Sequence, residues 1–290
     1  MPEDVSAHLF KNFVVLLVMA AIGVDPATVP AWTSSARQQE FTAGSTTQKE
    51  DVPVLWRDPG EIEKLDFADG PGGARTRPEP PFQFIDESLT GTKAKVRVVD
   101  SHGVRWMVKF GTEVRAQTFA ARLVWALGYF ALPTYFVPSG SIAGVTPLKR
   151  AAKYVKPDGR FTDASFQLYL DAEVHWLSDA KSWSWTANPF VGTRQLNGLK
   201  ILVMLLSDSD NKDARNRKFG SNTAILEYPS GEARYVVSDW GGAMGTWGGY
   251  LDRSNWNCIG FAVQTRDFIT VAHRDVGMGL PGAAHAGLHR

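Results

Sequence analysis

The fold is decided by residues 95–110, which read Lys95-Val-Arg-Val-Val-Asp-Ser-His-Gly-Val-Arg-Trp-Met-Val-Lys-Phe110. Apolar and polar side chains alternate on both sides of Asp100-Ser-His-Gly103, so this stretch predicts two strands joined by a tight turn. Phe82-Gln-Phe-Ile85 alternates in the same way and predicts a strand before them. Three consecutive strands with short turns form an antiparallel meander.

The segment after this meander changes from a period of two to a helical period. Residues 113–127 place apolar side chains at helical spacing, and Gly128 is suited to end the helix. A second helix is predicted over residues 193–206, and it is apolar nearly all round, which is typical of a buried helix. Further strands are predicted at residues 132–137, 223–228 and 233–237.

Composition limits the class of protein. The chain has 290 residues, 44% of them apolar, and a net charge of +1 at pH 7. The length suits one large domain or two small ones, and the charge does not suggest a nucleic-acid partner. Cys258 is the only cysteine, which excludes an internal disulfide and a cysteine zinc cluster. We expect Cys258 to be a small buried residue.

Near the N-terminus, residues 13–23 form an unbroken apolar run of eleven residues. A membrane-spanning helix needs about 20 residues, so no stable transmembrane anchor is indicated. The run suits the apolar part of a signal peptide, with a small-residue cleavage site at Val29-Pro30-Ala31. The alternatives are an exported or periplasmic protein with a signal peptide over residues 1–31, and a cytoplasmic protein with a buried N-terminal helix.

Three polar features follow one another in an order that suits phosphoryl transfer. Lys109 ends a strand, a dense polar loop over residues 207–216 follows the second helix, and Asp239-Trp-Gly241 closes the last hairpin. Phosphoryl transfer uses a lysine on the phosphates, an aspartate beside the attacking hydroxyl, and an asparagine and a second aspartate on a divalent metal.

These motifs resemble those of the protein-kinase-like superfamily on its atypical side, which includes HipA-type toxin kinases, phosphatidylinositol kinases and secretory-pathway kinases. Val108-Lys109-Phe110 is similar to the strand with the phosphate-binding lysine, and residues 113–128 to the helix behind it. Asp210-Asn-Lys-Asp-Ala-Arg-Asn216 resembles a catalytic loop, and Val237-Ser-Asp239-Trp-Gly241 the metal-binding Asp-Phe-Gly. The resemblance covers residues 82–249 and leaves residues 148–190 unmatched.

The resemblance implies roles for single residues. Lys109 would bind phosphate, oriented by Glu113 or Gln117, and Asp210 would be the catalytic base. The resemblance implies metal ligation of Mg²⁺ or Mn²⁺ by Asn216 and Asp239, with Asp208 and Asp213 as second candidates for base or ligand. Gly91 and Thr92 occupy the turn where a glycine-rich loop would cover the nucleotide.

The resemblance also implies an α+β fold with two lobes. Residues 81–146 would form a small antiparallel-sheet N-lobe with one packed helix, and residues 147–272 a mainly helical C-lobe. Residues 32–80 are expected to be a linker and irregular segment with short structured pieces near Val54 and Ile62. Residues 273–290 lack an apolar period and are expected to be an unstructured tail.

The function implied is ATP- and divalent-metal-dependent phosphotransfer to a protein, lipid or small-molecule acceptor. Asn216 stands six residues after Asp210, and position 117 holds glutamine, which leaves a weak or inactive binding module of the same fold as an alternative. A third possibility is an exported ligand-binding surface protein that uses its tryptophan-rich segments, such as Trp183-Ser-Trp185. These tryptophans are more typical of core packing.

Overall fold

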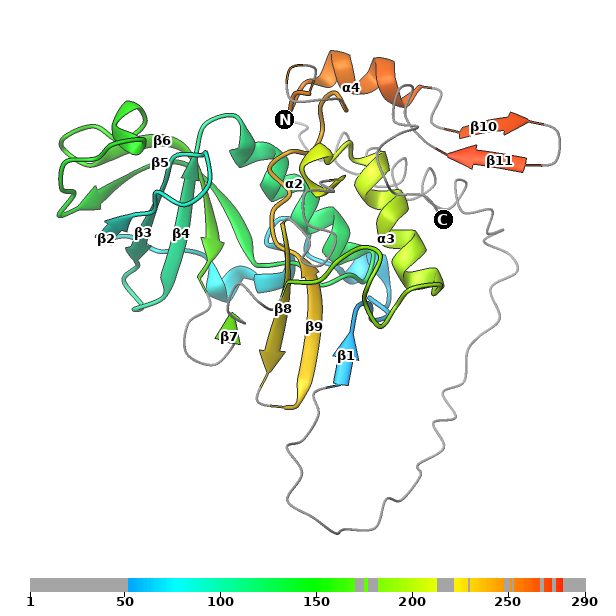
Figure 1. The fold of residues 1–290 in the computed structure, drawn as a ribbon. Coiled ribbons are helices and arrows are strands. Elements are labelled where there is room, and N and C mark those ends of the chain that lie inside the picture. The colour runs from blue at the N-terminus through cyan, green and yellow to red at the C-terminus, as the bar shows by residue number, and fades with distance from the viewer. Residues whose placement is uncertain are drawn as a thin grey trace, which may run out of the picture. The chain divides into compact units, whose positions relative to one another are not determined.

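A computed structural model describes residues 52–169, 175–176, 182–212, 222–228, 230–247, 251, 253–266, 269–272 and 275–278. The fold is α+β, as the sequence predicts (Figure 1). The predicted signal segment over residues 1–31 lies outside the described residues. No helix in the described part of the chain has both the length and the apolar character needed to cross a membrane.

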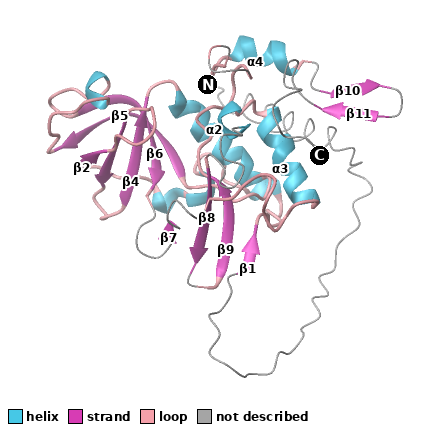
Figure 2. Ribbon diagram, in the orientation of Figure 1, coloured by secondary structure: helices cyan, strands magenta, loops and turns pink. Residues whose placement is uncertain are grey.

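The first structural unit is a five-stranded closed barrel with the strand order β2-β3-β4-β6-β5 (Figure 2). All its pairings are antiparallel except β2–β5, which is parallel and closes the barrel. The sequence predicted an antiparallel sheet, and the parallel closure is an addition to it. The strands are β2 (Phe82–Glu87), β3 (Lys95–Val99), β4 (Arg105–Phe110), β5 (Thr134–Ala143) and β6 (Arg160–Leu168).

Alternation along the strands explains both the barrel core and the position of Lys109. Val96, Val98, Trp106 and Val108 are fully buried inside the barrel. The residues between them point to the opposite face, because successive strand side chains alternate. Lys109 therefore lies outside the barrel, directly across from Lys95 on the neighbouring strand.

Helix α2 (Glu113–Ala126) packs against strands β4, β5 and β6 of the barrel. Its packed face uses small residues such as Ala116 and Ala120, which are fully buried and allow a close approach. The helix begins three residues after the end of β4, so Glu113, its first residue, lies near Lys109. The helix ends at Ala126, and Gly128 follows its C-cap with a φ of 89°, a left-handed conformation typical of a helix end. The predicted end of the helix is therefore confirmed.

The segment before the barrel packs along helix α2. It contains strand β1 (Val52–Val54) and three short 3₁₀ helices, η1 (Ile62–Lys64), η2 (Gly70–Gly72) and η3 (Ala74–Thr76). Trp56 Nε1 donates a hydrogen bond to Leu127 O (2.7 Å) at the end of α2. Strand β1 pairs in parallel with β9, so this segment connects α2 to a second sheet.

This second sheet has the strand order β1-β9-β8-β7. It contains β7 (His175–Trp176), β8 (Thr223–Tyr228) and β9 (Glu232–Val237). Trp183 is 2% exposed and donates from Nε1 to Val236 O (3.0 Å). Trp183 and Trp185 therefore belong to the core, and they do not form an exposed binding surface.

Helix α3 (Arg194–Leu205) leads to the predicted polar loop. Thr193 caps it, because its Oγ1 accepts a hydrogen bond from Leu196 N (3.2 Å). Buried side chains lie on one face, with Leu196, Leu199, Leu202 and Val203 all at most 3% exposed. The helix ends before η6 (Ser209–Lys212), which carries the polar loop.

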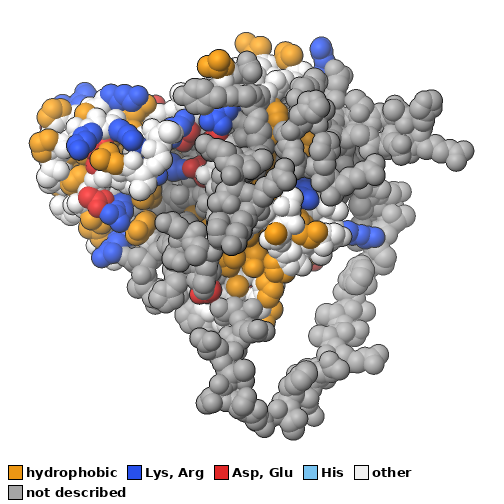
Figure 3. Space-filling model, in the orientation of Figure 1, with side chains coloured by type: hydrophobic (Ala, Val, Ile, Leu, Met, Phe, Trp, Pro, Cys, Tyr) orange, Lys and Arg blue, Asp and Glu red, His pale blue; other side chains and the backbone are white. Residues whose placement is uncertain are grey.

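The C-terminal elements were not predicted. Helix α4 (Cys258–Thr265) comes after strand β9 in the chain. After it, β10 (Ile269–Ala272) pairs with β11 (Asp275–Met278) in a separate two-stranded sheet. Strand β11 lies inside the segment expected to be an unstructured tail. The expectation of a buried Cys258 is wrong, since this residue is exposed. Ile259 and Val263 on α4 are also exposed, and apolar side chains are visible there in Figure 3.

Candidate functional site

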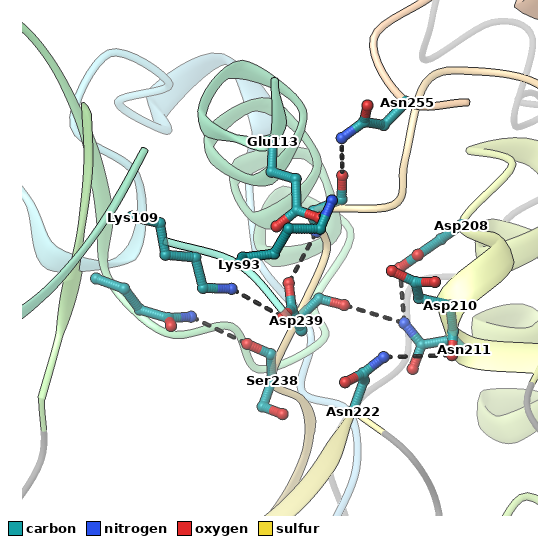
Figure 4. A network of polar contacts seen from close by, with 12 residues as sticks. Lys93, Lys109, Glu113, Asp208, Asp210, Asn211, Asn222, Ser238, Asp239 and Asn255 are labelled. Atoms are coloured by element: carbon teal, nitrogen blue, oxygen red, sulfur yellow. Dashed lines mark hydrogen bonds and ion pairs between the residues drawn. The ribbon is translucent and has the colours of Figure 1, made fainter. Parts of the chain in front are cut away.

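A polar network forms where the outer face of the barrel meets the segments that follow α3 and β9 (Figure 4). Strand β4 supplies Lys109 and the first turn of α2 supplies Glu113. The segment after α3 supplies Asp208, Asp210 and Asn211, and the segment after β9 supplies Asp239. Residues far apart in sequence thus share one site.

The central contact joins Lys109 to Asp239. Lys109 Nζ donates to Asp239 Oδ2 at 2.8 Å, and the two side chains are 7% and 33% exposed. Gly241 N donates to the other oxygen, Asp239 Oδ1 (2.9 Å). Burial acts to raise the pKa of Asp239, but the charge and hydrogen bond of Lys109 outweigh it, so this pKa is lower than usual.

Glu113 lies beside this pair and carries a cation of its own. Its Oε1 is 2.6 Å from Lys93 Nζ, and its side chain is 5% exposed. Burial raises the pKa of Glu113, and the negative charge of Asp239 raises it further against the effect of Lys93. A Cβ on Gly241 would lie 2.8 Å from Glu113 Oε2, so glycine is needed there for this carboxylate to approach.

Asp208 and Asn211 form the buried side of the site. Asn211 Nδ2 donates to Asp208 Oδ2 (2.6 Å) and to the backbone oxygen of Asp239 (3.1 Å). Asp208 is fully buried, and this burial raises its pKa well above the usual range. Asp208 Oδ1 and Asn211 Oδ1 are buried and have no hydrogen-bond partner among the described residues. Such atoms are rare in folded proteins and call for an explanation.

Asp210 is more accessible than Asp208, the other loop carboxylate that the structure describes. Its side chain is 28% exposed, and Arg253 donates to its Oδ1. Asn222 Nδ2 donates to the backbone oxygen of Asp210 (3.2 Å), which fixes the loop against the start of β8. A Cβ on Gly242 would lie 2.8 Å from Asp208 Oδ1 and 3.2 Å from Asp210 Oδ2, so the two carboxylates converge on this glycine.

These oxygens fit a small divalent cation as partial ligands. Mg²⁺ prefers oxygen donors and is usually held by one or two carboxylates, with water and substrate phosphates completing the shell. The unpartnered Asp208 Oδ1 and Asn211 Oδ1 are donors of this kind. Among the described residues no group of three or more His, Cys, Asp or Glu side chains is arranged to hold a metal. The described residues alone therefore supply an incomplete shell.

The structure brings five of the ten predicted site residues together in one network. Lys109, Glu113, Asp208, Asp210 and Asp239 share the network (Figure 4). Gln117 is 1% exposed in α2, and both polar atoms of its amide lack a hydrogen-bond partner. Of the two candidates for orienting Lys109, the structure therefore places Glu113 in the network and gives Gln117 no contact with it. Asp213 and Asn216 lie outside the described residues.

The predicted turn residues lie at the edge of the site. Thr92 lines a pocket together with Glu113. Gly91 has a φ of 68° and its carbonyl oxygen accepts a hydrogen bond from Arg150. The turn between β2 and β3 thus borders the pocket that Glu113 also lines.

Sequence reasoning missed Lys93, Lys95 and Asn211. Lys93 and Lys95 follow the Gly91-Thr92 turn directly, and Asn211 follows Asp210, so their positions beside predicted residues were the available signal. Burial and the charge of Lys109 lower the pKa of Lys95, while Asp239 and Glu113 oppose this. Three lysines therefore lie around two of the site's carboxylates, Glu113 and Asp239.

Comparisons with protein-family models, curated proteins and solved structures gave no match to this chain.

Proposed function

We propose that the protein is an ATP- and divalent-metal-dependent phosphotransferase of the atypical kinase type, with a two-lobed arrangement around the polar network. The observation that carries this proposal is the 2.8 Å contact between Lys109 Nζ and Asp239 Oδ2. It joins the strand lysine to the aspartate that follows the β8–β9 hairpin. The loop carboxylates Asp208 and Asp210 lie beside Gly242 in the same site.

Lys109 is suited to bind phosphate. Its side chain is almost fully buried, in a medium of low dielectric constant. Its electrostatic attraction for a phosphate is therefore stronger than that of a lysine on the surface. A nucleotide phosphate would compete with Asp239 for this ammonium group. Glu113 stays near Lys109 and is held by Lys93, so it can orient the lysine while Asp239 turns to another partner.

Asp210 is suited to the role of catalytic base. Its side chain is 28% exposed, whereas Asp208 is fully buried. A base must reach the proton of an acceptor hydroxyl, which requires exposure to the incoming substrate. Displacement of Arg253 from Asp210 Oδ1 would free the carboxylate for that proton.

Asp239, Asp208 and Asn211 are the described residues that would hold Mg²⁺ or Mn²⁺. A divalent ion there would neutralise charge on the phosphate oxygens during transfer. The side-chain oxygens of Asp208 and Asn211 that lack hydrogen-bond partners support this role, since a cation would satisfy both.

The proposal is tested by thermal unfolding with and without ATP and Mg²⁺ or Mn²⁺. Ligand at 100 times its dissociation constant stabilises by about 2.7 kcal/mol, which gives a clear rise in Tm. We expect a metal-dependent shift in the wild type and in the control Glu63→Gln, which alters an exposed residue, and none in Asp239→Ala. Transfer of labelled γ-phosphate is expected to be lost in Asp210→Asn while the shift remains.

The outcomes separate the alternatives. A shift without any phosphate transfer or ATP hydrolysis would identify a binding module without catalysis. A folded protein that shows no shift with any nucleotide would contradict the proposal and leave ligand binding at another surface as the alternative.

A further inference from the structure

A second polar pocket lies on the barrel side of the network. It has a volume of about 600 Å³ and is formed by the β2–β3 turn, the start of α2 and residues 149–154. Ligand pockets for small molecules have volumes of about 300–1,000 Å³, so this pocket has the size of a small-molecule site.

The pocket is strongly cationic. Four of its lining residues carry positive charge, and the only acidic one, Glu113, is already paired with Lys93. The remaining cations are Lys149, Arg150 and Lys153. Figure 3 shows Lys and Arg side chains gathered at the side of the molecule where strands β5 and β6 lie in Figure 1. A concave site lined by one sign of charge attracts ligands of the opposite sign.

The cations are held on a fixed frame. Glu87 accepts backbone hydrogen bonds from Lys149 N and Ala151 N, each at 2.7 Å. Arg150 Nη1 donates to Leu89 O (2.9 Å), and also to Gly91 O. These bonds join residues 149–151 to the β2–β3 turn, so the arrangement of charge is formed before any ligand arrives.

One wall of the pocket is aromatic. The rings of Phe110 and Tyr154 are stacked with centroids 6.0 Å apart and an angle of 12° between their planes. Lys153 Nζ lies 4.8 Å from the centre of the Tyr154 ring. A flat apolar wall beside several cations suits a small molecule that carries phosphate on an organic body.

Three of the four cations lie outside the residues that phosphoryl transfer requires. Lys149, Arg150 and Lys153 belong to the segment from residue 148 that matches no kinase-like motif. The network around Lys109 and Asp239 is complete without them. A nucleotide held by that network would therefore leave these three charges for another ligand.

We propose that this pocket is a second anion site, which binds a small phosphate-bearing molecule separately from the nucleotide. Arg150 and the two lysines bind the phosphate oxygens, since arginine and lysine form strong charge-assisted hydrogen bonds to phosphate. The partly exposed ring of Tyr154, which stacks on the buried Phe110, contacts the organic part of the ligand. The pocket reaches the network through Glu113, so a ligand bound in it lies next to the site of the proposed phosphotransfer.

The test uses inorganic pyrophosphate as the probe and isothermal titration of the full chain. The pocket variant is Lys149→Ala/Lys153→Ala. Lys64→Ala/Arg75→Ala is the matched control, because it removes two exposed cations elsewhere. All four substituted surface residues are exposed, so the barrel core is untouched.

We expect the wild type and the matched control to bind pyrophosphate with Kd values within about twofold of each other. The pocket variant should bind it about tenfold or more weakly, since charge-assisted hydrogen bonds are lost. ATP affinity should be the same in the pocket variant as in the wild type. Unchanged pyrophosphate binding in the pocket variant would overturn the proposal, and so would a parallel loss of ATP affinity. A chain that binds pyrophosphate in the pocket but no nucleotide would refute only the proposed phosphotransfer.

Discussion

Lys109 and Asp239 are 130 residues apart in the chain, yet Nζ of the lysine lies 2.8 Å from Oδ2 of the aspartate. The contact joins the outer face of strand β4 to the segment after β9. Closing so long a loop costs entropy that the folded structure must recover by burial elsewhere. Lys109 is almost fully buried there, and the carboxylate of Asp239 compensates its positive charge.

Replacement of Asp239 tests this dependence through stability. Asp239→Asn leaves the buried ammonium of Lys109 without a counter-ion, and we expect a loss of about 1–3 kcal/mol in the free energy of unfolding at neutral pH. The value lies below that for a fully buried pair, because the side chain of Asp239 is 33% exposed and water screens it. Urea denaturation of the two proteins measures the difference.

The pH dependence of this difference has a definite sign. The pKa of Asp239 is lowered in the folded protein, so the unfolded chain takes up the proton at a higher pH. The stability that the pair contributes is complete above the ordinary aspartate pKa of about 3.9 and is lost as the pH falls through the folded-state pKa. The gap between wild type and Asp239→Asn should therefore shrink in acid. A gap that stays constant down to about pH 3 would show that the ionised carboxylate is not its source.

Asp208 should behave in the opposite way. Burial raises its pKa, so the folded state retains a proton that the unfolded chain releases above about pH 3.9. Stability is therefore lost as the pH rises from that value toward the folded-state pKa. Asp208→Asn removes this titration and can still accept the hydrogen bond from Asn211 Nδ2.

We expect Asp208→Asn to be more stable than the wild type at neutral pH, because a neutral amide avoids the cost of ionising a buried carboxyl group whose pKa is raised. The advantage should disappear near pH 4 in urea denaturation. The same variant should lose the metal-dependent part of the nucleotide shift. A destabilised Asp208→Asn with normal metal dependence would mean that Asp208 serves only the fold.

Gly242 offers a test of site geometry without removal of any charge. A methyl group at this position would lie 2.8 Å from Asp208 Oδ1 and 3.2 Å from Asp210 Oδ2. Both carboxylates would have to move, and displacement of reacting groups by about 1 Å can cost 100-fold in rate. We expect Gly242→Ala to reduce phosphate transfer by about that factor while the protein stays folded. Circular dichroism and a transfer assay on one preparation check both halves, and full activity would place the reacting groups elsewhere.

The sequence predicted the regular parts of this fold because their patterns are clear. Alternation defined β3 and β4, and strand β8 was predicted with its observed bounds, residues 223–228. Strand β6 was missed because its core residues Phe161 and Ala164 are three apart, which breaks the period of two. Asp163 lies between them with a φ of 49°, a conformation that a strand pattern does not anticipate.

The site was predictable to the extent that charged residues stood at the ends of recognisable elements. Lys109, Asp210 and Asp239 each end or follow a strand or helix, and the structure brings them into one network. Asn211 was missed because a spacing argument pointed to Asn216, while the choice between neighbouring polar residues depends on the local turn after α3. Periodicity carries no information about such a turn.

Trp56 and Arg57, in the segment before the barrel, leave no room for a side chain at position 128. A Cβ there would lie 2.3 Å from the backbone oxygen of Arg57 and 2.4 Å from Trp56 Nε1, and the φ of 89° already disfavours any other residue. Gly60 is the matched control, because its φ is 75° but a Cβ would meet nothing within 4 Å. A side chain would strain the backbone to a similar degree at both positions, but only at Gly128 would it also collide with neighbouring atoms.

We therefore expect Gly60→Ala to lose about 1–2 kcal/mol of stability, the cost of a left-handed conformation for a residue with a side chain. Gly128→Ala should lose about 3 kcal/mol or more, because the backbone of Arg57 cannot move without breaking the contact between residues 56–57 and the end of α2. Urea denaturation of both variants measures the difference. Equal losses would show that this N-terminal segment does not press against helix α2 in solution, and that Glu113 at the other end of the helix is positioned by the barrel alone.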